Sequence, residues 1–315
     1  MCSGSEHAHA TRPWYRARVL ALAGRCLGLL IPVLLAGGCA TQRGKGVAAP
    51  ATPARSATGV PADTLRVCAD PNNLPFSNRA GEGFENALAT LVAGELGKTV
   101  AFTWFPQRRG FVRNTLASGR CDVIMGVPAH YELAATTTPY YRSSYVFVTR
   151  VDRGLDIDSF DDPRLARLRI GVHTIGDDYA NVPPAQALAA RGIVGNIRGY
   201  SIYGDYSRPD PPRDLVDAVA RGEVDVAIAW GPLAGYFATR EQTPLAVRIA
   251  RPTGLATAPM TFAIAMGVRR GDDELRATLD GVIARRHGDI DQLLRRYGVP
   301  LVEADPDGAP ADAAP

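Results

Sequence analysis

Residues 104–128 read WFPQRRGFVRNTLASGRCDVIMGVP, and this stretch decides the fold that the sequence predicts. A basic turn leads into a helix that ends at Gly119, with Phe111 and Leu116 on one side. The apolar run Cys121–Gly126 then predicts a strand buried in a parallel sheet. A strand, a helix and a second strand of this length form one βαβ crossover. Ligands bind beyond the carboxyl ends of such strands.

The chain around this stretch predicts two lobes of the same α/β kind. In the first, a strand at Leu65–Asp70 precedes a helix whose apolar face starts at Phe84; in the second, helices alternate with strands such as Val224–Trp230. Extended segments near Val148 and Thr261 cross between the two groups. The expected fold class is therefore α/β, a two-lobed clamshell with two hinge crossovers that closes around a ligand.

The domain boundaries follow from these elements and from composition. Near the C-terminus we expect one helix that Gly288 breaks and a short second helix that ends at Gly298. The predicted divisions are a signal segment at 1–39, a flexible linker at 40–63, lobe 1 at 64–148 and 261–302, lobe 2 at 149–260, and a disordered tail at 303–315.

The first residues carry an export signal. Several arginines precede a short apolar core, CLGLLIPVLL at 26–35, which is too short to span a bilayer. Small residues then lead to Cys39, an arrangement that resembles the lipobox of bacterial lipoproteins, in which the cysteine is lipidated. Ordinary signal peptidase cleavage nearby is the alternative. Either outcome predicts a periplasmic protein, held at a membrane only through an N-terminal lipid anchor if Cys39 is modified.

Export also bears on the cysteines and on the classes of partner. Of the 5 cysteines, Cys68 and Cys121 remain as an even pair in an oxidising compartment, where a disulfide or two buried thiols are the alternatives. The net charge of +3 is small, and there is no basic stripe, zinc spacing or phosphate loop. We therefore expect no nucleic acid partner, no metal and no cofactor.

Several motifs resemble a known family. GEGFEN at 81–86, PYYRSSYVFV at 139–148 and AIAWGPLAGYFA at 227–238 are similar to periplasmic solute-binding proteins of the amino-acid type, family 3. Within it they resemble the J component that accompanies PQQ-dependent methanol dehydrogenases, the quinoprotein dehydrogenase-associated ABC-transporter substrate-binding proteins. The resemblance implies the two-lobed fold, the periplasm and a link to alcohol oxidation. In such folds the first strand lies beside the third, which favours the disulfide between Cys68 and Cys121.

The resemblance breaks at two positions. Amino-acid binders carry an arginine before the PYY-like segment for the ligand carboxylate, and an aspartate at the end of the second-lobe strand for the ammonium group. By counting along this chain, those positions hold His130 and Trp230. A zwitterion that leaves water needs a cationic side chain for its carboxylate and an anionic side chain for its ammonium group. We therefore predict that the protein does not bind free α-amino acids well.

The candidate cleft residues each have a structural alternative. Trp230 is either an aromatic wall of the cleft or a core side chain, and His130 is either idle or faces the cleft. Arg108 and Arg109, at a helix start that their charge opposes, are either a site for an anion or a solvated end. The full set of expected cleft residues is Pro75, Phe76, Glu85, Trp104, Gln107, Arg108, Arg109, Val127, Pro128, His130, Tyr131, Tyr140, Tyr141, Asp177, Asp178, Tyr179 and Trp230.

Three functions fit the sequence to different degrees. A non-enzymatic accessory protein would bind a PQQ-dependent methanol dehydrogenase or its cytochrome. A receptor of an ABC importer would bind a small organic solute other than a free α-amino acid. An enzyme is disfavoured, because no nucleophile with a base and no catalytic carboxylate pair is recognisable. The accessory protein is the preferred hypothesis, and the importer receptor is the alternative.

Overall fold

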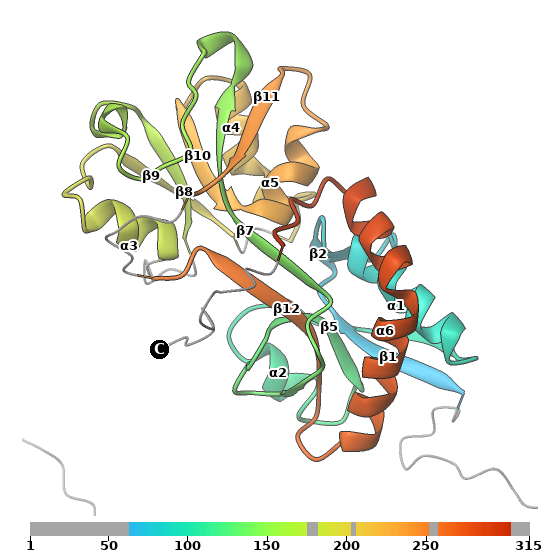
Figure 1. Cartoon of the computed structure of the whole chain (residues 1–315). Coiled ribbons are helices and arrows are strands. Elements are labelled where there is room, and N and C mark those ends of the chain that lie inside the picture. Colours follow the sequence, from blue (N-terminus) through green and yellow to red (C-terminus); the bar gives the residue numbers. More distant parts are fainter. Residues whose placement is uncertain (1–62, 175–181, 203–205, 252–257, 304–315) are drawn as a thin grey trace, which may run out of the picture. The chain divides into compact units, whose positions relative to one another are not determined.

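The computed structural model describes residues 63–174, 182–202, 206–251 and 258–303 (Figure 1). The expected signal segment, most of the linker and tail, Cys39, and the candidates Asp177, Asp178 and Tyr179 lie outside these ranges. Among the described residues, no helix has both the length and the apolar character needed to cross a membrane.

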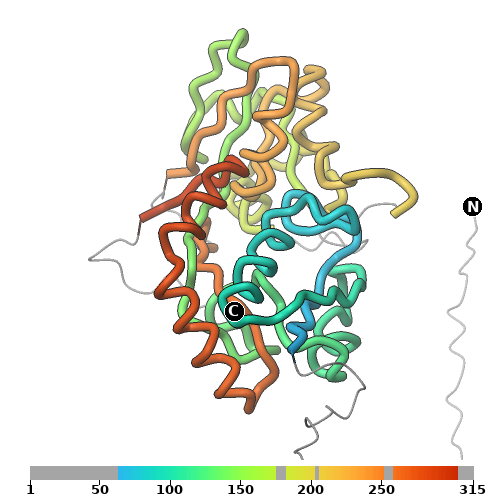
Figure 2. The backbone as a smooth tube through the Cα atoms, turned by 90° about the vertical axis from the view of Figure 1, so that its right-hand side faces the viewer, coloured from blue at the N-terminus to red at the C-terminus, as the bar shows by residue number. Residues whose placement is uncertain are grey.

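The first lobe is built on parallel strands that are covered by helices. Its elements are β1 (Thr64–Ala69), β2 (Asn72–Asn73), β3 (Ser77–Asn78), α1 (Phe84–Glu95), β4 (Thr99–Trp104), α2 (Phe111–Asn114), β5 (Val123–Pro128), β6 (Ala135–Thr136), the first part of β7 (Tyr141–Arg150), β12 (Thr261–Val268) and α6 (Asp273–Arg296). Strands β4, β1 and β5 are parallel, and β12 joins β5 antiparallel. Helices α1 and α6 lie side by side over this sheet and bury Phe84, Leu88, Leu279 and Val282 (Figure 2).

The second lobe repeats the α/β layering with its own core. Its elements are the 3₁₀ turns Val151–Arg153, Pro163–Ala166 and Pro211–Arg213, with β8 (Ile170–Thr174), α3 (Pro183–Ala189), β9 (Ile197–Ser201), α4 (Asp214–Ala220), β10 (Val226–Trp230), α5 (Gly231–Ala238) and β11 (Leu245–Ile249). Strands β10, β8 and β9 are parallel. Their side chains Val226, Ile170 and Ile228 are buried in the core of this lobe. The predicted two-lobed α/β fold is confirmed.

Strand β7 belongs to both lobes. From Tyr141 to Ser144 it pairs with β12, and from Tyr145 to Arg150 it pairs with β10 on one side and β11 on the other (Figure 1). The partner of Ser144 in β12 is Thr261, so the two crossing strands exchange lobes at the same level. We propose this level as the lobe boundary, which places the first crossover earlier than the expected position near Val148.

One predicted helix ends earlier than expected. Helix α2 stops at Asn114 instead of reaching Gly119, because Thr115 leaves the helical region at φ −126° and ψ −83° and donates its hydroxyl to the Phe111 carbonyl at 2.6 Å. Side-chain bonds of this kind compete with the helical ladder. Gly119 still adopts the predicted left-handed conformation, at φ 72°.

The C-terminal prediction of two helices is confirmed, but the break lies at Arg286, two residues before the expected Gly288. Helix α6 is interrupted there because Arg286 leaves the helical region at φ −109° and ψ 16°. Buried side chains on both sides of this kink continue one packed face, and the second part ends before Gly298, which is left-handed at φ 72°.

The predicted disulfide between Cys68 and Cys121 is present. Cys68 lies in β1, Cys121 lies just before β5, and their Cα atoms are 5.4 Å apart. Both side chains are buried with Phe111 and Leu116 in a small apolar cluster beneath the basic turn. The bond therefore links β1 to the start of β5, the last strand of the βαβ unit that the sequence singled out.

The chain after α6 touches both lobes. Tyr297 stacks on Tyr236 of α5 at a ring distance of 5.8 Å and meets Phe84 of α1 edge-on at 5.9 Å. The backbones of Gly235 and Gly298 are so close that a Cβ on Gly235 would lie 1.9 Å from the Gly298 carbonyl oxygen. We call this segment, residues 297–302, the C-terminal strap.

Candidate functional site

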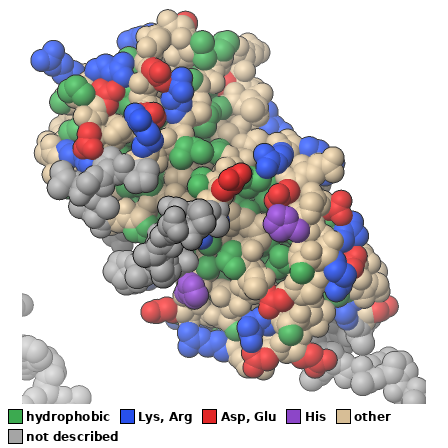
Figure 3. Space-filling model, in the orientation of Figure 1, with side chains coloured by type: hydrophobic (Ala, Val, Ile, Leu, Met, Phe, Trp, Pro, Cys, Tyr) green, Lys and Arg blue, Asp and Glu red, His purple; other side chains and the backbone are tan. Residues whose placement is uncertain are grey.

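An aromatic cavity of about 300 Å³ lies where the lobes meet, and we call it the cleft cavity. It lies beside the crossing strands, and Figure 3 shows hydrophobic side chains near the middle of this face, with some charged side chains next to them. Its volume is at the lower end of the range for small-molecule sites. The side chains that shape its walls are Phe76, Glu85, Tyr141, Tyr145, Trp230 and Phe262.

Three of these aromatic rings form one wall. Tyr145, Trp230 and Phe262 belong to β7, β10 and β12, and each ring meets the other two edge-on at 5.5 to 6.4 Å between centroids. All three side chains remain partly exposed toward the cavity. Edge-to-face packing fixes the rings and leaves part of their surface for a ligand. Trp230 therefore combines both readings of the sequence: it packs against the core and also lines the cleft.

Glu85 supplies the only acidic side chain that lines the cleft cavity among the described residues. The loop before α1 places it there, because the Phe84 and Glu85 amides donate to the Pro75 and Phe76 carbonyls at 2.8 and 2.9 Å. Its carboxyl group lies over Gly126 of β5, where a Cβ would come within 2.3 Å of Oε1. Glycine at position 126 thus makes room for this carboxyl group.

Burial changes the protonation of Glu85. The side chain is 8 % exposed and accepts no hydrogen bond from any described residue. Burial, with a smaller effect of the neighbouring Asp70 carboxylate, raises the pKa of Glu85 to about 8. Burial also raises the pKa of Tyr141 well above its usual value, and Glu85 adds to that shift.

Asp70, just after β1, holds the two lobes together at the edge of the cavity. Its carboxylate accepts hydrogen bonds from the backbone amides of Asn72 and Gln107, and from the Tyr206 hydroxyl of lobe 2 at 2.7 Å. Asn72 adds two more bonds across the lobes: its side chain donates to the Arg208 carbonyl and accepts from the Asp210 amide. The structure therefore shows the lobes in contact on this side.

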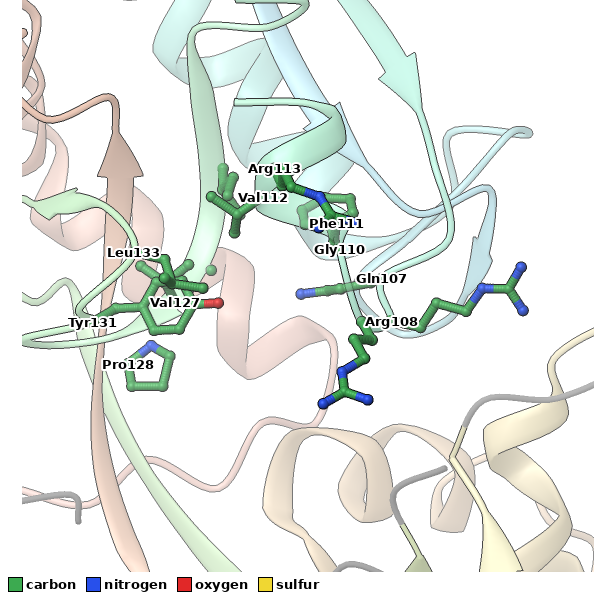
Figure 4. A pocket seen from close by; sticks show the side chains of 13 residues that line it. Gln107, Arg108, Gly110, Phe111, Val112, Arg113, Val127, Pro128, Tyr131 and Leu133 are labelled. Atoms are coloured by element: carbon green, nitrogen blue, oxygen red, sulfur yellow. The ribbon is translucent and has the colours of Figure 1, made fainter. Parts of the chain in front are cut away.

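A second hollow of about 530 Å³ lies beside the first, and we call it the basic cavity (Figure 4). Figure 4 shows Gln107 extending from one wall toward Val127 and Tyr131 on the other. Arg108 and Arg109 are exposed on one side of the cavity, and Leu133, 61 % exposed, lies across from Arg108 in Figure 4. Because α2 is a single turn, the expected conflict between these arginines and a helix dipole is slight.

The structure divides the expected cleft residues among several places. Trp104 lies in another hollow, where Arg79 stacks on its ring at 5.6 Å. Tyr140 is buried in the core, and its hydroxyl donates to the Met125 carbonyl at 2.8 Å. Pro75 and His130 line neither cavity. The expected residues that do line one or both cavities are Phe76, Glu85, Gln107, Arg108, Arg109, Val127, Pro128, Tyr131, Tyr141 and Trp230.

Sequence reasoning missed three contributors to the cleft cavity. Tyr145 and Phe262 lie at the level where β7 and β12 exchange lobes, and Gly126 provides the space for the Glu85 carboxyl group. The crossover itself was the signal for the two aromatic residues, since side chains on hinge strands face the cleft. Among the described residues, no cluster of three His, Cys, Asp or Glu side chains is arranged to hold a metal ion.

Known relatives match most of the chain. Protein MoxJ of Methylorubrum extorquens is 33% identical over 249 residues, which cover 76% of this chain and 82% of that protein. Protein MoxJ of Paracoccus denitrificans is 31% identical over 260 residues, which cover 76% of this chain and 91% of that protein.

Solved structures agree with this. The crystal structure of the periplasmic binding protein XoxJ from Methylobacterium extorquens AM1 matches with a TM-score of 0.64 and 37% identity, over 76% of this chain and 100% of that one. An ancestral cationic amino acid solute-binding protein shares the fold, with a TM-score of 0.58 at 21% identity, over 75% of this chain and 96% of that one. The family model described as bacterial extracellular solute-binding proteins, family 3, matches residues 65–300. The resemblance seen in the sequence is confirmed, and the chain belongs to this family of solute-binding proteins.

Proposed function

We propose that this chain is a periplasmic, non-enzymatic accessory protein of a PQQ-dependent methanol or alcohol dehydrogenase system, and that it acts by binding the dehydrogenase or its cytochrome partner. The observation that carries this proposal is the similarity to MoxJ over three quarters of the chain, at 33% identity. We further propose that the leader directs export and that Cys39 receives a lipid anchor.

The cleft supports a role other than amino-acid capture. Trp230 occupies the position where amino-acid binders place the aspartate, and its ring forms part of an aromatic wall. Among the described residues that line the cleft cavity there is no Arg, Lys or His to hold a ligand carboxylate. A buried carboxylate without a basic partner is strongly unfavourable, so a free α-amino acid lacks half of its recognition here.

The basic cavity is the surface to test first for the dehydrogenase. Two exposed arginines, Arg108 and Arg109, line this cavity together with the exposed apolar side chain of Leu133 on the other side. Arginine side chains near apolar ones are typical of protein interfaces, where arginine is enriched and the centre loses water. An acidic surface with an apolar side chain is the partner chemistry that fits.

The experiment is light scattering of the purified protein, eluted from a size-exclusion column with the dehydrogenase in its PQQ-loaded and apo forms. We expect a complex with at least one form, weakened when Arg108 and Arg109 are both replaced by alanine. The matched control is Arg270→Ala, another exposed arginine of the same lobe. Absence of a complex with either form and with the cytochrome contradicts the proposal.

A receptor for an ABC importer is the alternative, and the aromatic cavity between the lobes is the observation that favours it. A true solute binds the folded state only, so it raises the melting temperature by mass action. A thermal-shift screen of organic acids, quinones and alcohols separates this alternative from the accessory role, in which the dehydrogenase stabilises the protein and these solutes do not.

A further inference from the structure

The cleft cavity has the chemistry of a cation site. Aromatic rings attract a cation to their faces, with tryptophan the strongest. Here Trp230, Tyr145 and Phe262 form one wall, and Phe76 and Tyr141 lie on the lobe 1 side. The rings are held by their edge-on contacts with one another, so a ligand that enters does not have to order them.

The second element of the site is the Glu85 carboxyl group. It is buried, lines the cavity, and accepts no hydrogen bond from any described residue. Glycine at 126 leaves the space that this carboxyl group occupies, since a Cβ there would lie 2.3 Å from Oε1. A buried polar group without a partner costs free energy, and a ligand that supplies the partner recovers it.

We propose that the cleft cavity binds a small organic ammonium ion that carries no carboxylate, with Glu85 as its counter-ion and the aromatic rings around Trp230 as its walls. The missing basic side chain in the described lining excludes a zwitterion and leaves room for a cation alone. Glu85 lies in the first turn of α1, where the helix dipole favours a negative charge once the ligand has bound. This site is independent of the proposed dehydrogenase contact, and either one stands if the other fails.

Three ligands of nearly the same shape test the charge requirement. Choline is a cation, 3,3-dimethyl-1-butanol is its neutral isostere, and glycine betaine carries the same ammonium group with a carboxylate. Isothermal titration calorimetry of the full chain at pH 8.5 should detect choline and neither of the others. Equal binding of the neutral alcohol, detectable binding of betaine at similar affinity, or no binding of choline each overturns the proposal.

Substitutions test whether Glu85 and Trp230 contact the bound ammonium ion. Glu85→Gln keeps the size of the side chain and should weaken choline binding by about tenfold or more, which is the loss expected when one charge-assisted contact is removed. Glu132→Gln removes an exposed carboxyl group of the same lobe and should change nothing. Trp230→Leu should weaken binding as well, with circular dichroism showing that each variant is folded. Unchanged affinity in Glu85→Gln refutes the assignment of the counter-ion.

The pH dependence of choline binding shows whether Glu85 acts as an ionised counter-ion or as a protonated hydrogen-bond donor. The ionisable group that acts on Glu85 is Asp70 at the end of β1, and Glu85 in turn acts on Tyr140 and Tyr141 of the neighbouring chain segment. Because the pKa of Glu85 is raised to about 8, choline should bind more tightly as the pH rises from 6 to 9 and should release a proton at pH 7. An affinity that falls over this range overturns the proposal.

Discussion

Removal of the Cys68–Cys121 bond should lower the stability of the first lobe by a large amount. The two cysteines are separated by 53 residues in sequence. In the chain-entropy account, closing a loop of this length reduces the entropy of the unfolded chain by an amount worth about 4 kcal/mol at 25 °C. For a protein of this size, each kcal/mol moves the melting temperature by roughly 2–4 °C, so the expected loss is roughly 8–16 °C.

The assay compares three samples of the chain from residue 40 onward, which lacks Cys2, Cys26 and Cys39. Thermal unfolding is followed by circular dichroism for the oxidised protein, for the same protein after reduction, and for the double variant Cys68→Ala/Cys121→Ala. Both cysteine side chains are buried, so the double variant also loses their packing and should melt at or slightly below the reduced protein. Titration of the denatured, unreduced protein should find no reactive thiol. Two reactive thiols, or a double variant that melts within a degree of the oxidised protein, would refute the reasoning.

Three further substitutions have expected outcomes. Tyr206→Phe removes the hydroxyl that donates to Asp70 across the lobes, so the free energy of unfolding should fall by about 1.5–3 kcal/mol. The radius of gyration in small-angle scattering should increase. An unchanged radius and stability would speak against this contact. His173 is buried, and burial lowers its pKa to about 4, so the folded state binds a proton at this side chain less readily than the unfolded chain does. Its contribution to stability is therefore present above pH 6.5 and is lost as the pH falls toward 4. His173→Gln should make the melting temperature depend less on pH over that interval, and an unaltered slope would assign the loss to other groups. Gly235→Ala places a methyl group against the Gly298 carbonyl and should lower the free energy of unfolding in urea by about 3 kcal/mol or more. The control Gly94→Ala, with nothing near the added Cβ, should be neutral or stabilising. Similar values for the two variants would contradict the close approach of Gly235 and Gly298.

The fold was predictable because local signals and tertiary packing agree over most of the chain. Apolar runs mark the parallel strands, and Gly97 and Gly298 follow the ends of α1 and α6 in left-handed conformations. The predictions failed where one residue's own conformation overrides a local pattern. Thr115 ends α2 through a side-chain bond that no periodicity shows, and the kink in α6 falls at Arg286, two residues before the expected Gly288.

The candidate site was predictable only in part. The end of a predicted strand pointed to Trp230, because this position follows from topology alone. The depth of a side chain depends on neighbours that are distant in sequence, and Tyr140 is therefore in the core although Tyr141, the next residue, lines the cleft. The space over Gly126 that admits the Glu85 carboxyl group is likewise a property of two elements together, and neither sequence motif shows it alone.

The C-terminal strap limits how the two lobes can move. Two crossing strands alone act as a pair of flexible rods, about which one lobe can both bend and twist. The strap adds a third attachment, since Val302 donates its amide to the Arg142 carbonyl of β7 at 3.0 Å, Ser143 donates its hydroxyl to the Pro300 carbonyl at 2.6 Å, and Gly298 lies against α5. A third fixed point opposes torsion and leaves bending as the softer degree of freedom. We therefore expect the cleft to open mainly by bending at this level, so that closure brings the aromatic wall and the Glu85 carboxyl group back into the same alignment.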